Sequence, residues 1–301
     1  MVAASAKLWE LGDTGLTQEQ IDLYHAEGYL ALSGVFSPGR VAELSAVTDQ
    51  FVEKSREVTE SGDIFDVEEG HTAERPRLRR LRHPYDQHEA YDRAMRDERV
   101  MGVITQLIGD NVRYQGGKLN IKPPEVGSAF EWHQDWGFFP HTNDDLLAVG
   151  IALEDVLLEN GCLMVVPRTH KDPIYDHTQD GVFVGAVDPA GLDDVAVPLV
   201  LPAGSMSVHH VRLLHGSAPN RSPRSRRLLL FEYAAADAWP LVSQPSWETL
   251  QKRMVRGEMT ALPRLENVPV RLPFPREGDK RKSIFELQKT LKRSGFEATT
   301  T

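Results

Sequence analysis

The feature that most constrains the fold of this chain is a series of short β-rich runs between residues 112 and 233. Turn signals separate the runs, among them a Pro-Pro pair, Asn-Asp and Asn-Gly steps and a Pro-Ala-Gly turn. Several short strands with such punctuation predict an all-β sandwich or barrel rather than a parallel α/β sheet. The expected strands span residues 112–122, 129–135, 146–155, 162–166, 195–201, 205–214 and 227–233.

Helices are predicted on both sides of this β-rich region. Thr17 to Gln20 has the pattern of a capping box, and Gly28 is placed to end the helix that begins there. Ser37 and Pro38 pair a helix N-cap with a proline at the first helical position. The prediction is completed by a loose leader over residues 1–16, a strand over 29–32, a loop over 61–75, and helices over 89–109 and 283–293.

The 301 residues are expected to form one structural domain, because a chain of this length can bury a stable core without disulfides. Within it we distinguish an N-terminal helical region (1–110), a β-rich core (111–240) and a C-terminal extension with a terminal helix (241–301). No internal repeat divides the chain further.

The composition limits where in the cell the protein is expected and which classes of partner it is expected to bind. The only cysteine, Cys162, excludes an intramolecular disulfide and a thiolate zinc cluster, and it favours a reducing interior. The N-terminus lacks the pattern of a signal peptide, and the apolar stretch at 146–153 is far too short to span a bilayer. A net charge of −10 argues against nucleic-acid binding. We therefore expect a cytoplasmic protein that binds neither nucleic acid nor membrane, in an oligomeric state that the sequence leaves open.

Residues 131–136 contain a His-x-Asp sequence, His133 and Asp135, inside an expected strand. Residues two apart on a strand point to the same face, so one imidazole and one carboxylate can hold one metal ion. A third ligand must come from elsewhere, and His215, 215 − 135 = 80 residues further on, is the best candidate. Two histidines and a carboxylate form the facial triad of non-haem Fe(II) oxygenases, which leaves positions open for a cosubstrate and O₂.

Polar and basic residues near these positions are candidates for the rest of such a site. Lys118, Asn120 and Lys122 alternate along an expected strand, so they share one face, and a polar inner face is costly unless it meets ligands or charge. An arginine beyond His215, among residues 224–227, could form a bidentate pair with a carboxylate.

The basic run at residues 75–83 has two interpretations. Most of its arginines are expected to form a solvated face. Arg79 or Arg80 could instead turn inward and meet an anionic cosubstrate.

Four motifs follow one another along the chain. They are Leu-Asn-Ile-Lys-Pro-Pro at 119–124, Trp-His-Gln-Asp-Trp at 132–136, the segment 159–171, and His-Gly-Ser-Ala-Pro-Asn-Arg-Ser at 215–222 followed by Arg226. With these motifs the sequence resembles the phytanoyl-CoA dioxygenase family of Fe(II)/2-oxoglutarate oxygenases, over residues 16–240. The resemblance implies a mainly β fold with flanking helices, in the form of a double-stranded β-helix (a cupin-like jelly roll).

The resemblance also implies roles for individual residues. The iron ligands would be His133, Asp135 and His215. Arg226, which lies 226 − 215 = 11 residues past the distal histidine, would pair with the distal carboxylate of 2-oxoglutarate. The further candidates for binding the cosubstrate are Asn120, Lys118, Gln134, Ser217 and Arg80.

The activity implied by the resemblance is that of a 2-oxoglutarate-dependent dioxygenase. Such an enzyme would use O₂ to oxidise a C–H bond of a small-molecule metabolite and would release succinate and CO₂. Asp135 favours hydroxylation, desaturation or ring closure over halogenation, because related halogenases lack the carboxylate. The alternatives are a cupin-type metalloenzyme that does not use 2-oxoglutarate, which Arg226 argues against, and a non-catalytic jelly-roll binding module. The sequence does not choose among acyl-CoA thioesters, amino acids and natural products as the substrate.

Overall fold

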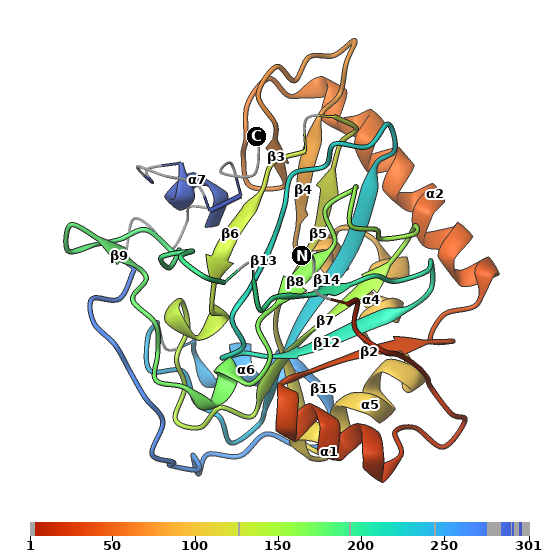
Figure 1. Ribbon diagram of the computed structural model, residues 1–301. Helices are drawn as coiled ribbons and strands as arrows, with labels where there is room; N and C mark the ends of the chain where they lie inside the picture. Colours follow the sequence, from red (N-terminus) through yellow and green to blue (C-terminus); the bar gives the residue numbers. More distant parts are fainter. Residues whose placement is uncertain are drawn as a thin grey trace.

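Two facing β-sheets, with helices packed against one of them, make up the architecture (Figure 1). The computed structural model describes residues 4–125, 127–192, 194–243, 245–275, 284–289, 291 and 295–296. The larger sheet has, in spatial order, β1 (Leu8–Glu10), β2 (Tyr29–Ser33), β12 (Met206–His210), β7 (Leu146–Ala152), β14 (Arg226–Ala235), β5 (Val112–Lys122), β4 (Leu78–Arg82) and β3 (Phe65–Val67), with β15 (Met254–Arg256) also paired to β5. The smaller sheet has β11 (Val197–Leu199), β8 (Leu163–Val165), β13 (His215–Ser217) and β6 (Phe130–His133).

Strands that are distant in the sequence are neighbours in both sheets. The last long strand, β14, lies antiparallel between β5 and β7, and β13 lies antiparallel between β6 and β8. Four-stranded and larger antiparallel layers that exchange strands in this way form a jelly roll. The predicted mainly β fold with flanking helices is therefore confirmed. A small hairpin of β9 (Thr178–Gln179) and β10 (Val182–Phe183) lies outside both sheets.

Helices cover the outer face of the larger sheet. They are α1 (Gln18–Glu27), α2 (Pro38–Lys54), α4 (Glu89–Met95) and α5 (Glu98–Ile108), and α3 (Pro84–Gln87) is a single turn before α4. The predicted capping box of α1 is present, and Gly28 ends the helix with φ of 86°. The largest hydrophobic core joins these helices to outward-facing strand residues such as Leu119, Val149 and Phe231.

Several predicted segments differ from the structure. The helical stretch expected over 89–109 is confirmed and ends at Gly109, but it is divided after Met95, where Asp97 caps a new helix by accepting a hydrogen bond from the Arg99 amide at 3.0 Å. The loose leader expected over residues 1–16 is wrong in part, since β1 pairs in parallel with β2. The basic run contains a buried strand, β4, and its Arg79 and Arg80 are both buried. The predicted solvated face therefore does not hold for these two arginines.

Successive side chains of β14 point to opposite faces of the larger sheet, one towards the interior between the sheets and one towards the helices. Arg226, which begins the strand, and Glu232 face the interior between the sheets. Arg227 faces the other side, where it forms ion pairs with Asp49 and Glu154. One strand thereby supplies polar groups to the interior and apolar groups to the core beneath the helices.

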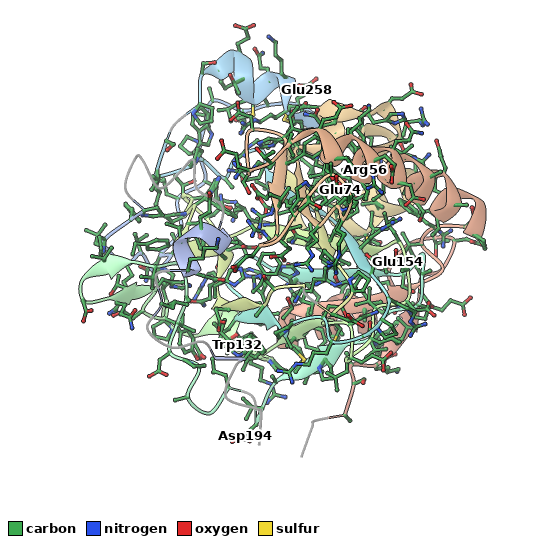
Figure 2. All side chains as sticks on the ribbon, turned by 90° about the horizontal axis from the view of Figure 1, so that it is seen from above. Arg56, Glu74, Trp132, Glu154, Asp194 and Glu258 are labelled. Atoms are coloured by element: carbon green, nitrogen blue, oxygen red, sulfur yellow. The ribbon has the colours of Figure 1, made fainter. Side chains whose placement is uncertain are left out.

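Residues near the end of the chain complete the wall of the smaller sheet. In α7 (Ile284–Gln288), the Gln288 side chain accepts a hydrogen bond from the Glu131 amide at 3.0 Å and donates one to the Gly185 carbonyl at 2.9 Å. Trp132 on β6, labelled in Figure 2, is fully buried and stacks on Phe296 with ring centroids 5.4 Å apart. The ends predicted for the terminal helix, at residues 283 and 293, lie outside the described residues.

None of the helices in the described ranges combines the length and the apolarity that crossing a bilayer requires.

Buried histidines are expected to make the fold sensitive to acid. Burial lowers the pKa of His141 to about 3 and that of His177 to about 4. In the unfolded chain both titrate near a pKa of about 6.5, so between these values the unfolded state binds more protons and stability falls with decreasing pH. We expect the thermal unfolding midpoint to drop steadily below about pH 6.5. A His141→Leu variant with an equally steep decline would contradict this origin.

Candidate metal centre and its pocket

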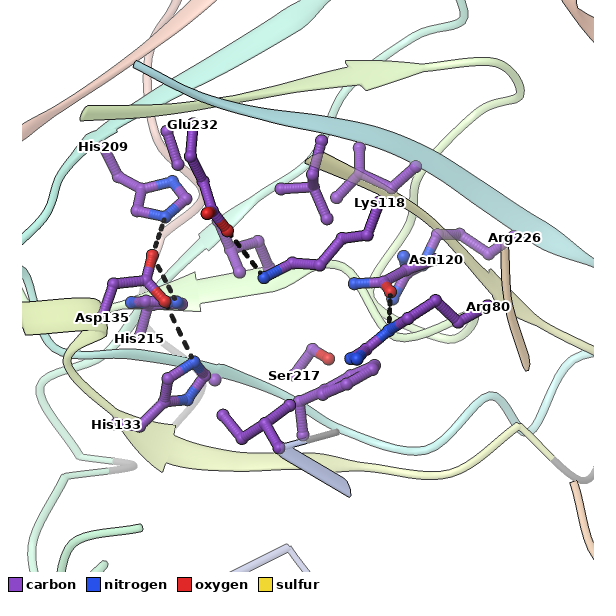
Figure 3. A pocket seen from close by; sticks show the side chains of 17 residues that line it. Arg80, Lys118, Asn120, His133, Asp135, His209, His215, Ser217, Arg226 and Glu232 are labelled. Carbon is purple, nitrogen blue, oxygen red and sulfur yellow. Dashed lines mark hydrogen bonds and ion pairs between the residues drawn. The ribbon is translucent and has the colours of Figure 1, made fainter. Parts of the chain in front are cut away.

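A cavity lies between the two sheets (Figure 3). Both sheets contribute side chains to its wall, so the groups that meet there come from segments far apart in the sequence. The larger sheet supplies Arg80, Lys118, Asn120, Ala148, His209, Arg226 and Glu232, and the smaller sheet supplies Phe130, His133, Leu163, His215 and Ser217.

Three potential metal ligands meet at one end of this cavity. His133 ends β6, His215 begins β13, and the two residues are directly paired across the sheet. Asp135 follows two residues after His133, and its carboxylate oxygens lie 3.8 Å from His133 Nε2 and 4.0 Å from His215 Nε2. All three side chains are buried, and one ligand atom of each lies within 4.8 Å of the others. This is the donor set of a 2-His-1-carboxylate site.

Asp135 is not on the strand where the His-x-Asp spacing was expected to place it. β6 ends at His133, and Asp135 is the first residue of a 3-10 helix, η2 (Asp135–Gly137). The predicted strand over 205–214 is likewise too long, because β12 ends at His210 and a turn leads into β13. These two bends bring Asp135 and His215 to the same point from different directions.

Backbone carbonyls fix how the two histidines are presented. His133 Nδ1 lies 2.7 Å from the Glu131 carbonyl and His215 Nδ1 lies 2.9 Å from the Leu213 carbonyl. A carbonyl only accepts, so Nδ1 carries the proton in each ring and Nε2 has a free lone pair directed at the centre. Burial lowers the pKa of His133 to about 4 and that of His215 well below its usual range, which keeps both rings neutral and able to ligate.

Asp135 is kept ionised despite its burial. Burial by itself raises the pKa of this carboxyl, but the nearby His209 imidazole and the electrostatic effects of His215 and Lys118 outweigh it. The net result is a pKa below the usual range of an aspartate. The centre thus offers one negative and two neutral donors, which suits a divalent cation.

The opposite end of the cavity is rich in buried cations. Arg80 Nε donates to Asn120 Oδ1 at 3.1 Å, and Arg226 Nη2 donates to the Gly161 carbonyl at 3.0 Å. Arg226 is only 2% exposed, and in the described part of the chain its Nε atom has no hydrogen-bond partner and no carboxylate forms an ion pair with it. A buried guanidinium in this state is costly unless an anion binds it, so these residues fit the distal carboxylate of a dicarboxylic acid.

Of the other predicted site residues, some reach the cavity and some do not. Lys118 and Ser217 line it, and Lys118 is held by Glu232. Gln134 does not line it, because its side chain donates to the Arg212 carbonyl and accepts from the Tyr175 amide. Of the two arginines left open in the basic run, Arg80 enters the cavity.

Two cavity residues are not indicated by the motifs. His209 on β12 is buried, and neither of its ring nitrogens has a hydrogen-bond partner among the described residues. Glu232 on β14 lies opposite Ala148, which in turn lies opposite His209. Strand alternation places each on the inner face, but only the strand order of the sheet shows that they meet beside Asp135.

His209 is expected to orient Asp135, since its Nε2 atom lies 3.7 Å from Asp135 Oδ2. Groups that hydrogen-bond a metal ligand typically change metal affinity 10- to 100-fold. We expect His209→Phe to weaken Fe(II) binding by about 10-fold or more, measured by anaerobic calorimetry without cosubstrate. His210→Gln on the same strand, whose ring lies near Asp144, serves as the control. Equal affinities in both variants would contradict this role.

Sequence comparisons agree with this geometry. The family described as "Phytanoyl-CoA dioxygenase (PhyH)" matches residues 24–228. A "Probable alpha-ketoglutarate-dependent hypophosphite dioxygenase" of Stutzerimonas stutzeri is 36% identical over 282 residues, covering 91% of this chain and 97% of that protein. The ectoine dioxygenase of Stutzerimonas stutzeri (strain A1501) is 26% identical over 251 residues, covering 76% of this chain and 80% of that protein.

Solved structures share the fold. EctD from S. alaskensis with bound Fe superimposes with a TM-score of 0.66 at 23% identity, covering 89% of this chain and 92% of that chain. The non-heme alpha ketoglutarate dependent carbocyclase SnoK from nogalamycin biosynthesis gives a TM-score of 0.59 at 23% identity, covering 75% and 86%. By the extent of the family match and by its identity to the Stutzerimonas protein, the chain belongs to the phytanoyl-CoA dioxygenase family.

Proposed function

We propose that this protein is an Fe(II)- and 2-oxoglutarate-dependent dioxygenase that oxidises a small molecule. The observation that carries the proposal is the presence, in one cavity, of three converging metal ligands and a buried arginine that has no anionic partner among the described residues. His133, Asp135 and His215 would hold the metal, and Arg226 would hold the cosubstrate. Its curated relatives include 2-oxoglutarate-dependent enzymes by name, which supports the same activity.

Fe(II) with bound 2-oxoglutarate supplies the oxidative decarboxylation in which one atom of O₂ enters succinate and the other enters the substrate. The chain itself binds and orients. Arg226 and Arg80 anchor the distal carboxylate, with Asn120 and Ser217 beside them. Apolar side chains such as Phe130 and Leu163 exclude water from the other wall of the cavity.

The carboxylate of Asp135 bears on the type of oxidation. It occupies a metal position that halogenation would need for a halide, so we propose oxygen insertion, or the related desaturation or ring closure. A cupin-type metalloenzyme without 2-oxoglutarate gives no role to the buried Arg226, which forms no ion pair with any described carboxylate. A non-catalytic binding module gives no role to two neutral histidines and one aspartate whose ligand atoms converge as they do in a metal site.

Two kinds of substrate are suggested by the relatives. The most extensively matched of the relatives described above acts, by its name, on hypophosphite, which has P–H bonds. Ectoine and phytanoyl-CoA, named for relatives at 25–30% identity, have C–H bonds. We propose a small substrate rather than an acyl-CoA thioester, because the same cavity must hold the cosubstrate as well. The single cysteine supports a cytoplasmic location.

The test is anaerobic addition of Fe(II) and then 2-oxoglutarate to the metal-free protein. The expected result is the weak visible charge-transfer band of the chelate, followed by succinate release when O₂ and a substrate are admitted. Succinate in place of 2-oxoglutarate is the control and should give no band, since it lacks the keto group. Absence of the band despite confirmed iron binding would reject the proposal in favour of the cupin-type or binding-module alternatives.

A further inference from the structure

One charged pair in the cavity is left without a role by the proposed function. Within the described residues, the cavity wall holds five charged side chains, which are Arg80, Arg226, Asp135, Lys118 and Glu232. The first three serve the cosubstrate and the metal. Lys118 on β5 donates from Nζ to Glu232 Oε1 on β14 at 2.9 Å, and this pair remains (Figure 3).

The pair lies on the metal side of the cavity, away from the cosubstrate anchor. Lys118 is paired across the sheet with Leu230, four residues along β14 from Arg226. At about 3.3 Å per residue, the two backbone positions are separated by about 13 Å along the strand. Figure 3 shows the Lys118 ammonium directed towards the side of the cavity where Asp135 and His215 lie.

Small residues leave space beside the pair. Glu232 lies opposite Gly116 on one neighbouring strand and opposite Ala148 on the other. A Cβ atom at Gly116 would lie 2.8 Å from Glu232 Oε2, so the carboxylate extends over the glycine. Gly116 thereby lets the carboxylate reach Lys118, and a residue larger than Ala148, which lines the cavity, would fill space beside the pair.

The hydrogen-bond donors of Lys118 define what such a ligand carries. The other charges of the cavity wall do not call for a further ion, because Arg80 pairs with the buried Asp66 at 3.6 Å and Lys118 pairs with Glu232. A lysine ammonium has three N–H donors and Glu232 takes one of them, so the others can bind an oxygen atom of a ligand on the metal side of the cavity.

We infer that Lys118, held in place by Glu232, is the substrate-binding group and that the substrate is a small oxyanion. This inference rests on the proposed function and names the substrate class of the same site. It moves Lys118 from the cosubstrate, where the family resemblance placed it, to the substrate. Hypophosphite, named for the relative at 36% identity, is such an ion.

The test measures anion binding to the anaerobic Fe(II)–2-oxoglutarate protein by calorimetry, with hypophosphite as the singly charged probe and phosphite, at alkaline pH, as the doubly charged one. Lys118→Met is expected to weaken hypophosphite binding by about 10- to 100-fold and to leave 2-oxoglutarate affinity within about threefold. Glu232→Gln adds one positive charge and is expected to shift the preference towards phosphite. Lys252→Met, which removes the lysine of the exposed Lys252–Glu248 pair, is the matched control and should change neither.

Three results would contradict, respectively, the role of Lys118, the class of substrate and the proposed function. A Lys118→Met variant that loses 2-oxoglutarate affinity would return Lys118 to the cosubstrate. A natural protein that shows the visible band but binds neither hypophosphite nor phosphite would reject the small oxyanion. A natural protein without the band would reject the proposed function itself. The band also reports that the cavity of each variant is folded.

Discussion

Replacing Asp135 by alanine is expected to abolish 2-oxoglutarate turnover, with a loss of at least about 100-fold. Changes to groups that only hydrogen-bond a metal ligand already cost about 10- to 100-fold in metal affinity or activity. The variant keeps His133 and His215 but loses the only negative ligand of the centre. Two neutral imidazoles hold a divalent ion weakly and without the third point that fixes its orientation. The measurement is succinate formed per protein, together with Fe(II) affinity under anaerobic conditions.

The control for this prediction is an aspartate outside the cavity. Asp176 is half exposed, pairs with Arg271 and does not line the cavity, so Asp176→Ala should retain turnover. Full activity in Asp135→Ala would refute the assignment of the metal ligands. Retained iron binding without turnover would show that Asp135 orients the metal more than it holds it.

Replacing Arg226 by alanine is expected to raise the Kd for 2-oxoglutarate by roughly 100-fold and to remove the visible band at ordinary cosubstrate concentration. Truncating one partner of a buried, hydrogen-bonded charge pair costs about 2–5 kcal/mol, and each 1.4 kcal/mol is a tenfold change in affinity. Burial lowers the pKa of Arg226 only to about 10, so the guanidinium remains charged and able to bind a carboxylate at neutral pH.

The neighbouring residue provides a control of the same type on the same strand. Arg227 faces away from the cavity and pairs with Asp49 and Glu154. Arg227→Ala removes an equal charge and is expected to lower thermal stability while leaving cosubstrate affinity unchanged. Equal losses of affinity in the two variants would show that a general loss of structure, rather than a missing carboxylate anchor, explains the Arg226 result.

The parts of the site that lie in local motifs could be read from the sequence. The structure brings His133, Asp135 and His215 together, as their order and residue types predicted, and it turns Arg226, the arginine singled out by the resemblance, into the cavity. The fold class followed from the same regular punctuation of short strands. These features depend on patterns of a few residues, which a single sequence contains.

Features that depend on strand order could not be obtained in this way. Glu232 and His209 approach the metal centre only because β14, β7 and β12 are adjacent in the larger sheet. The inward turn of Arg80 follows from pairing of β4 with β5, which sets it opposite Asn120. Gln134 follows the first ligand in the motif, yet the bend into η2 directs its amide to loop backbone instead of the cavity.

The position of Ile284 in the cavity wall has a consequence for the order in which the site is made during synthesis. The metal ligands and Arg226 leave the ribosome before Ile284, which is 284 − 226 = 58 residues later. Until α7 docks through Gln288 onto β6, the cavity lacks the part of its wall that Ile284 supplies. The metal ligands are therefore complete in the growing chain before this part of the wall is made, and a bulky group fused close behind α7 is expected to disturb it.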